Sequence, residues 1–230
     1  MALFWIDERN KIYISYDDFI RDLNLSGENN KIIYEENPYY IFRNLLRNLI
    51  CNKSSTILDH DFSESELNLL GVSKSSFIES KYFQKDLNYD FEDIIDLLIK
   101  KQKHLVLSIF TSGTTGRPKV VDQSFENIIR AVKVGDRFRS NVWGFAYNPT
   151  HFAGFQVFFQ AFFNRNQIIY LFKSHTNEIC QSLTIHKITN ISCTPTLIKM
   201  IVSSLVKPSD YLLSITLGGE KLDHKTYQIV

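Results

Sequence analysis

Apolar residues in the second half of the chain occur in short blocks that alternate between the strand pattern and the helix pattern. Residues 105–110 form an apolar run, which is expected for a strand buried on both faces of a sheet. Later blocks predict strands at 142–147, 168–172, 189–193 and 214–217, and helices at 126–134, 152–163, 178–186 and from Pro195 onward. This alternation predicts an α/β fold, with a doubly wound, mostly parallel sheet and flanking helices.

The first half of the chain has a less regular pattern. It predicts strands at 4–6, 11–15, 31–34 and 55–58, and helices at 17–23, 38–50, 63–70 and 91–101. The helix at 38–50 places Ile41, Leu45 and Leu49 on one stripe. Ser63, followed by Glu66 three positions later, is typical of a helix start. Residues 73–89 are polar and show no clear period.

Charge and composition exclude some partners. The 230 residues carry 26 basic and 25 acidic side chains, a formal net charge of +1. A field this weak does not steer a protein to nucleic acid or to an anionic membrane. The three cysteines, Cys51, Cys180 and Cys193, match no zinc spacing and are expected to be reduced thiols. No apolar run approaches membrane-spanning length, and the start has no signal-peptide pattern, so we expect a cytoplasmic protein without a membrane span.

One loop combines glycines, hydroxyl side chains and a lysine directly after the predicted strand at 105–110. It consists of Thr111, Ser112, Gly113, Thr114, Thr115, Gly116, Arg117, Pro118 and Lys119. A loop that follows a parallel strand lies at the carboxyl edge of the sheet, where ligands bind. Glycines let main-chain N–H groups approach a ligand, the hydroxyls add four donors, and the lysine adds a positive charge. The loop is therefore predicted to hold the phosphates of ATP.

Two other interpretations of this phosphate loop are open to a direct check. A Walker-type loop needs Gly, four residues, and then Gly-Lys-Ser or Gly-Lys-Thr. Counted from Gly113, the second glycine position holds Pro118, and Lys119 is followed by Val120, so this interpretation fails. A plain flexible turn is also rich in Ser, Thr and Gly. The specific pattern of nine residues at 111–119 makes the plain turn the weaker interpretation.

Residues 111–119 resemble, almost letter for letter, the phosphate-loop signature of the adenylate-forming superfamily. Its members include acyl-CoA synthetases, aryl-CoA ligases, luciferase-like enzymes and the adenylation domains of peptide synthetases. The family signature usually continues with glycine, where this chain has Val120. The resemblance covers residues 103–230 strongly and residues 1–100 only in general pattern. It implies a variable amino-terminal α/β subdomain at 1–102 and an incomplete ATP-binding α/β subdomain at 103–230.

Residues 148–154 look like the Pro-x-x-His-x-x-Gly segment of the same superfamily. The resemblance implies that His151 lines the acyl pocket, which makes it the candidate catalytic residue. The alternative is a histidine that caps a helix or is satisfied in the core, which is the usual role of a lone histidine. Its position downstream of the phosphate loop favours the pocket.

Residues 191–197 and 215–222 are similar to two further family segments, and the second contains Gly218, Gly219 and Glu220. In the family this Gly-Gly-Glu turn lies along the adenine ring. Two glycines expose bare backbone on which a flat base can stack. The alternative is a strand-to-helix turn in which Glu220 favours the helix dipole. Both can hold at once.

Together these segments imply ATP-dependent activation of a carboxylic acid as an acyl-adenylate, with release of pyrophosphate. ATP and Mg²⁺ are the implied cofactors, and coenzyme A or a carrier-protein thiol is the implied acceptor. The compact amino-terminal region resembles short-form ligases such as o-succinylbenzoate–CoA ligase. Another possibility is a ligase that activates an acyl or amino-acid group for polysaccharide or natural-product assembly. A non-catalytic nucleotide-binding remnant or interaction module is the alternative from another class.

The family continues beyond the residues present here with a Tyr-Gly-x-Thr-Glu type segment, whose Glu binds magnesium, and an Asp that grips the ribose. A small carboxy-terminal domain then carries a Lys that contacts the carboxylate. None of these lies within the 230 residues, so the chain looks like the truncated amino-terminal core of such an enzyme. We expect little or no adenylation activity from it alone.

Overall fold

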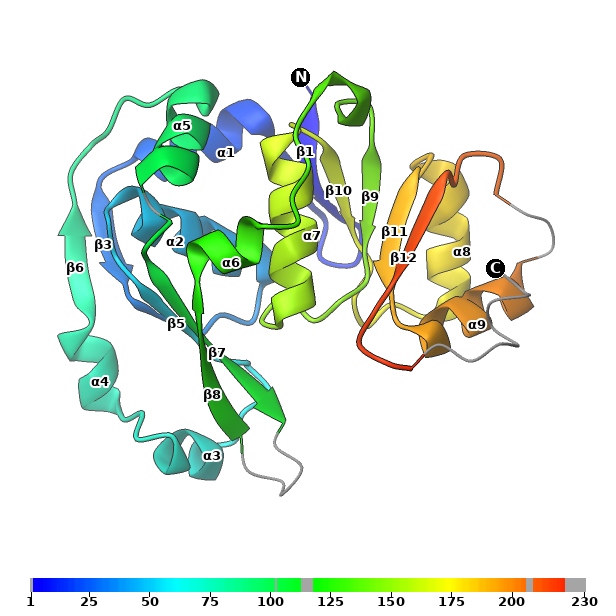
Figure 1. The fold of residues 1–230 in the computed structure, drawn as a ribbon. Helices are drawn as coiled ribbons and strands as arrows, with labels where there is room; N and C mark the ends of the chain where they lie inside the picture. Colours follow the sequence, from blue (N-terminus) through cyan, green and yellow to red (C-terminus); the bar gives the residue numbers. More distant parts are fainter. Residues whose placement is uncertain (1, 102, 113–117, 206–208, 222–230) are drawn as a thin grey trace. The chain divides into compact units, whose positions relative to one another are not determined.

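The computed structural model describes residues 2–101, 103–112, 118–205 and 209–221. The chain forms two compact units (Figure 1). Unit 1 consists of residues 1–16, 132–149 and 153–230, and unit 2 consists of residues 17–131 and 150–152. The division into subdomains at 1–102 and 103–230, which the resemblance implies, stays a prediction. The two compact units have other boundaries.

Unit 1 is built on a six-stranded sheet with the order β12-β11-β9-β10-β1-β2. Its strands are β1 (Leu3–Asp7), β2 (Ile12–Ser15), β9 (Val142–Phe145), β10 (Gln167–Tyr170), β11 (Asn190–Cys193) and β12 (Ser214–Leu217). All neighbours in the sheet are parallel except β1 and β2, which are antiparallel. The mostly parallel sheet predicted from the alternating pattern is thus confirmed.

Helices cover both faces of this sheet (Figure 1). On one face, Ile169 and Ile191 pack with residues of α8 (Thr176–Ile185) and α9 (Pro195–Ser204). Side chains alternate between the two faces of a strand, so Tyr170 points to the other face. There the ring of Trp5 stacks on that of Tyr170. Strand β1 is irregular between Leu3 and Trp5, and in this stretch the ring of Phe4 contacts Phe158 and Phe162 of α7 (Phe152–Phe163). The sheet is therefore doubly wound.

Helix α7 is apolar except for Gln156 and Gln160, which lie four residues apart on one side, so most of its surface has the pattern of a buried helix. Phe155, Phe158, Phe159 and Phe162 are each 0% exposed. The rings of Phe158 and Phe162 stack with centroids 5.8 Å apart, and the ring of Phe4 lies 6.0 Å from each of them. These phenylalanines form the core of unit 1, as their helical spacing predicts.

Unit 2 contains a four-stranded sheet with the order β4-β5-β7-β8 and a separate pair, β3 and β6. Strands β4 (Ile32–Ile33), β5 (Ser55–Ile57) and β7 (Val106–Ser112) are parallel, and β8 (Pro118–Ser124) is antiparallel to β7. Strands β3 (Gly27–Asn30) and β6 (Lys81–Gln84) pair antiparallel. The helices of this unit are α1 (Tyr16–Asn24), which begins at the boundary with unit 1, α2 (Pro38–Ile50), α3 (Glu64–Leu69), α4 (Lys74–Glu79), α5 (Phe91–Lys101) and α6 (Phe125–Ile129).

Where strong local signals exist, the predicted and observed elements agree. Helix α2 has the predicted bounds, with Asn37 as N-cap and Pro38 in the first turn. Helix α3 begins after Ser63 with the predicted capping box to Glu66. Helix α6 is shorter than the predicted helix at 126–134 and ends at Ile129.

Strand β7 differs from the expectation of burial on both faces. Leu107 and Ile109 are buried, but Val106 and Ser108 are half-buried. Val106 and Ser108 lie on the opposite face of the strand from Leu107 and Ile109, and there the hydroxyl of Ser108 donates to Oδ1 of Asp122 (2.6 Å) in β8, a strand that the sequence pattern did not predict. The exposed Val120 of β8 shows that one face of this sheet meets solvent at the hairpin.

Candidate functional site

The phosphate loop is framed by the two strands of the β7–β8 hairpin. In the strand register, Thr111 pairs with Lys119 and Ser112 with Pro118. The backbones of Thr111 and Ser112 therefore close β7, and Lys119 is the second residue of β8. The predicted site residues Gly113, Thr114, Thr115 and Gly116, together with Arg117, lie outside the described residues.

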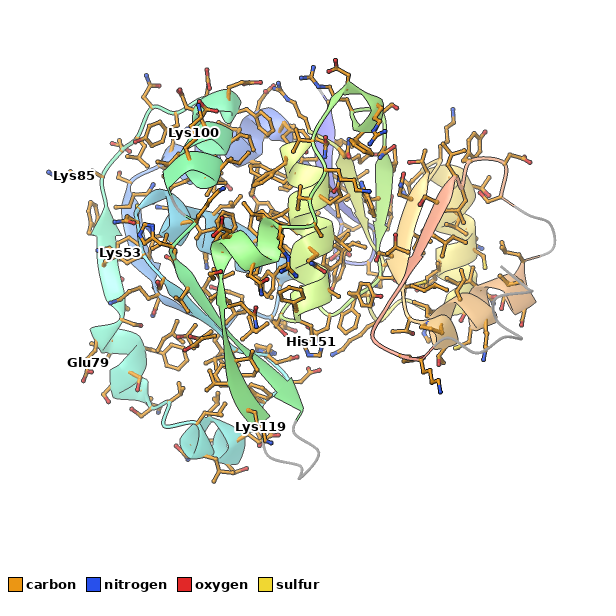
Figure 2. All side chains as sticks on the ribbon, viewed as in Figure 1. Lys53, Glu79, Lys85, Lys100, Lys119 and His151 are labelled. Atoms are coloured by element: carbon orange, nitrogen blue, oxygen red, sulfur yellow. The ribbon has the colours of Figure 1, made fainter. Side chains whose placement is uncertain are left out.

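The hairpin places the phosphate loop at the carboxyl edge of the sheet in unit 2. Because β4, β5 and β7 are parallel, their carboxyl ends share one edge, and β7 leads from that edge into the loop. Figure 2 shows Lys119 near the start of β8. Its side chain is exposed, so its charge is available to an anion in solution.

Val120 departs from the family signature, and its place in the sheet is defined. It pairs with Phe110 and is the third residue of β8. Its side chain is 57% exposed. A β-branched side chain suits a pleated strand, where glycine would be less favourable. Val120 therefore supports a regular strand directly after the loop.

A turn at the end of β5 lies at the same edge as the phosphate loop. The N–H of Phe62 donates to the carbonyl of Asp59 (3.0 Å), and the N–H of Asp61 donates to Oδ1 of Asp59 (3.0 Å). The ring of Phe62 packs edge-on against Phe110, with centroids 5.8 Å apart. Phe110 directly precedes Thr111, so this packing joins the turn to the strand that enters the loop.

His151 belongs to unit 2, within the three-residue segment 150–152. It lies just before the start of α7 and is exposed, which does not fit a core histidine. The atoms around it remove part of its hydration and lower its pKa from the ordinary value of 6.5, and the negative charge of Asp59 opposes this shift. The hydroxyl of Thr150, its neighbour, donates to Oδ2 of Asp59 at 3.2 Å.

The Gly-Gly-Glu turn lies in unit 1, after β12. The carboxylate of Glu220 accepts hydrogen bonds from the backbone N–H (3.1 Å) and the hydroxyl (2.6 Å) of Thr196, in the first turn of α9. These bonds lower the pKa of Glu220 from 4.5, with the hydroxyl as the main cause. An anion at the amino end of a helix is favourable. Glu220 thus stabilises the start of α9, a helix that precedes it in the sequence.

Bare backbone is exposed beside this turn. The hydroxyl of Tyr147 donates to the carbonyl of Cys193 (2.8 Å), and the N–H of Gly218 donates to the same carbonyl (3.2 Å). A Cβ atom on Gly218 would lie 3.2 Å from the Tyr147 oxygen, which is a tight contact. Gly219 has φ of +82°, a conformation that favours glycine. The backbone conformation therefore requires glycine at 219, and the absence of a side chain at Gly218 leaves room for the Tyr147 hydroxyl.

The predicted site residues form two sets, one in each unit. Unit 2 holds the hairpin around the phosphate loop and His151, and unit 1 holds Gly218, Gly219 and Glu220. Sequence reasoning missed Asp59 and Tyr147. Asp59 follows the predicted strand at 55–58, and Tyr147 is the last residue of the predicted strand at 142–147. Their place at the carboxyl ends of strands was the available signal.

Metal-binding clusters and membrane-spanning helices are both absent from the residues that the structure describes. Among them, no cluster of three His, Cys, Asp or Glu side chains is suited to a metal ion. Within the same residues, no helix is both long enough and apolar enough to cross a bilayer.

Comparisons with known proteins agree with the fold and the loop. A 2-succinylbenzoate–CoA ligase from Bacillus pumilus is 30% identical over 116 residues, which is 48% of this chain and 24% of the relative. The o-succinylbenzoate coenzyme A synthetase (MenE) from Bacillus subtilis, in complex with ATP and magnesium, has a TM-score of 0.70 at 15% identity. That match covers 99% of this chain and 54% of the synthetase, so the chain spans about half of its length.

A second similar solved structure is that of an N-terminal subdomain. The NpsA N-terminal subdomain from Klebsiella oxytoca, in complex with 3-hydroxyanthranilyl-AMSN, has a TM-score of 0.71 at 13% identity. The match covers 99% of this chain and 64% of that one. The model of the AMP-binding enzyme family matches residues 43–229, which is most of the chain and includes all four sequence segments described above. The chain therefore belongs to the AMP-binding enzyme family.

Proposed function

We propose that this chain provides the ATP- and acyl-adenylate-binding part of an AMP-forming carboxylate ligase of the acyl-CoA synthetase type. The ligase activates a carboxylic acid as an acyl-adenylate and transfers the acyl group to a thiol such as coenzyme A. The relatives named 2-succinylbenzoate–CoA ligase support an organic carboxylate as substrate and coenzyme A as acceptor. Its cytoplasmic location stays a prediction.

One observation carries this proposal. The carboxyl edge of the sheet in unit 2 holds both ends of the phosphate loop, at Ser112 and Pro118, and the segment with His151 belongs to the same unit. The packing of Phe62 on Phe110 and the bond from Thr150 to Asp59 tie both features to one turn. Phosphate-binding residues and an acyl-pocket residue that are attached to one turn would suit acyl-adenylate formation.

The reaction brings two anions together. A carboxylate oxygen attacks the α-phosphorus of ATP, the bond from this phosphorus to the bridging oxygen breaks, and pyrophosphate leaves with the electron pair. Oriented donors and positive charge must offset the repulsion. In this chain Lys119 and the main-chain N–H groups of the phosphate loop are proposed to hold the β- and γ-phosphates. Mg²⁺, bound with ATP, would neutralise part of the phosphate charge.

The other predicted residues are assigned by their chemistry. Gly218 and Gly219 are proposed to receive the adenine ring, because bare backbone lets a flat base approach. A side chain at Gly218 would also crowd the hydroxyl of Tyr147. The lowered pKa of His151 keeps its imidazole neutral at pH 7, so it would not hold the substrate carboxylate as a competing ion pair. The 230-residue chain alone is proposed to bind ligand but to catalyse adenylation slowly or not at all.

A binding experiment tests the proposal. The chain would be titrated calorimetrically with acyl-sulfamoyl-adenosines, in which a sulfamate replaces the reactive phosphate, carrying a panel of acyl groups that includes o-succinylbenzoyl. We expect at least one to bind about tenfold more tightly than sulfamoyl-adenosine without an acyl group. If ATP binds but no acyl group increases affinity, the chain is a nucleotide-binding module and the proposal is wrong.

A further inference from the structure

The carboxylate of Asp59 accepts hydrogen bonds from both a nearby and a distant residue. Oδ1 accepts from the N–H of Asp61, two residues away, and Oδ2 accepts from the hydroxyl of Thr150, 91 residues away. The first bond closes a turn of the Asx type and sets the orientation of the carboxylate. In this orientation the second oxygen, Oδ2, faces Thr150.

The turn that carries Asp59 is itself firmly held. It follows β5 through Leu58, which is 0% exposed and donates its N–H to the carbonyl of Ile33 (2.9 Å). The hydroxyl of Tyr34 lies 3.3 Å from the carbonyl of His60 and 3.2 Å from that of Phe62. Neighbouring strands and a buried leucine thus fix Asp59 at the carboxyl edge of the sheet.

Thr150 is where the distant segment meets this turn. Its side chain is only 4% exposed, and a buried hydroxyl needs an acceptor. The stretches on either side, residues 132–149 and 153–230, belong to unit 1, whereas residues 150–152 between them belong to unit 2. A contact that holds Thr150 therefore also determines where the next residue, His151, lies in unit 2.

We propose that Asp59 is a positioning residue, which holds the segment 150–152, and with it His151, on unit 2 at the edge where β7 enters the phosphate loop. The proposal rests on the proposed function, in which His151 lines the acyl pocket. Asp59 acts through Thr150 and through its charge, and it has no part in the chemical step. The hydrogen bond provides the position, and the negative charge favours protonation of the nearby imidazole.

Hydrogen–deuterium exchange of residues 148–153 in the 230-residue chain tests the position. Asp59→Ala and Thr150→Val should each speed this exchange by about tenfold, the effect of one lost buried hydrogen bond to a charged group. Asp59→Asn should stay close to the wild type, because its carbonyl can accept from Asp61 while its amide donates to the Thr150 hydroxyl. Glu79→Ala, which removes an exposed carboxylate of unit 2, is the control (Figure 2).

The histidine resonances provide a readout that a purely structural role would not change. His151 would be assigned with a His151→Gln variant and titrated by NMR. Asp59→Asn should lower the pKa of His151, since it removes the opposing charge, and Glu79→Ala should not. Unchanged exchange in both Asp59→Ala and Thr150→Val, or an unchanged pKa in Asp59→Asn, would overturn the proposal. If exchange and pKa respond but the affinity for the acyl-sulfamoyl-adenosine does not, Asp59 positions His151 and the pocket role of His151 is wrong.

Discussion

Replacing Phe158 with Ala is expected to lower the free energy of unfolding of unit 1 by about 3–5 kcal/mol. The side chain is 0% exposed, and its ring lies 5.2 Å from that of Phe159, 5.8 Å from that of Phe162 and 6.0 Å from that of Phe4. Truncation removes apolar burial and leaves a cavity lined by rigid rings that cannot easily fill it. The loss is a large fraction of the roughly 5–15 kcal/mol that stabilises a typical domain, so the unfolding midpoint of the variant should fall markedly.

Urea unfolding followed by tryptophan fluorescence measures this effect selectively. Both tryptophans, Trp5 and Trp143, lie in unit 1 and are buried. Leu213→Ala, in the same unit at a side chain that is 79% exposed, is the control and should change the free energy by less than about 0.5 kcal/mol. Similar unfolding midpoints for the two variants would show that the phenylalanines of α7 do not form the core.

Replacing Gly154 with Ala is expected to destabilise unit 1 although alanine is the better helix former. Helix propensity alone would favour alanine by about 1 kcal/mol. A Cβ atom at this position, however, would lie 2.4 Å from the carbonyl oxygen of Asn148 and 3.2 Å from Cα of Pro149. Both are backbone atoms and cannot rotate away, so overpacking by about 1–3 kcal/mol or more should exceed the propensity gain.

The same substitution is expected to affect the site. Relief of the clash must displace the backbone at residues 148–149, which leads directly into Thr150 and His151. We therefore expect weaker binding of the acyl-sulfamoyl-adenosine, together with a lower midpoint in urea. Gly144→Ala is the comparison variant, because its Cβ atom would meet side-chain atoms of Leu171 (3.0 Å), Ile191 (3.3 Å) and Ile188 (3.4 Å) instead of backbone atoms. A more stable Gly154→Ala variant would contradict the close approach.

Elements with strong local signals could be predicted from the sequence. Helix α2 has an apolar stripe, an Asn cap and a proline in its first turn, and its observed bounds equal the predicted ones. The parallel strands of unit 1 are short apolar runs between helices, and the family signature at 111–119 located the loop. In each of these cases the information is contained within a dozen consecutive residues.

Elements that depend on distant partners could not be predicted. Strand β6 shows an exposed Lys81 and an exposed Phe83, and it is a strand because it pairs with β3, more than 50 residues earlier. Helix α4 buries none of its residues and depends on the capping box at Ser73, so it has no apolar stripe to detect. The contact between Asp59 and Thr150 joins residues 91 positions apart, and no local pattern in either segment points to the other.

The central claim is that residues 111–119 hold the phosphates of ATP, and calorimetric titration of the 230-residue chain with MgATP and with AMP tests it most directly. The account predicts saturable binding of one ATP per chain, and Lys119→Ala should weaken ATP binding by about tenfold because one charge-assisted contact to phosphate is lost. AMP, which lacks the β- and γ-phosphates, should bind with nearly equal affinity to the wild type and to the variant. An undetectable affinity for ATP, or an ATP affinity that does not depend on Lys119, would contradict the claim.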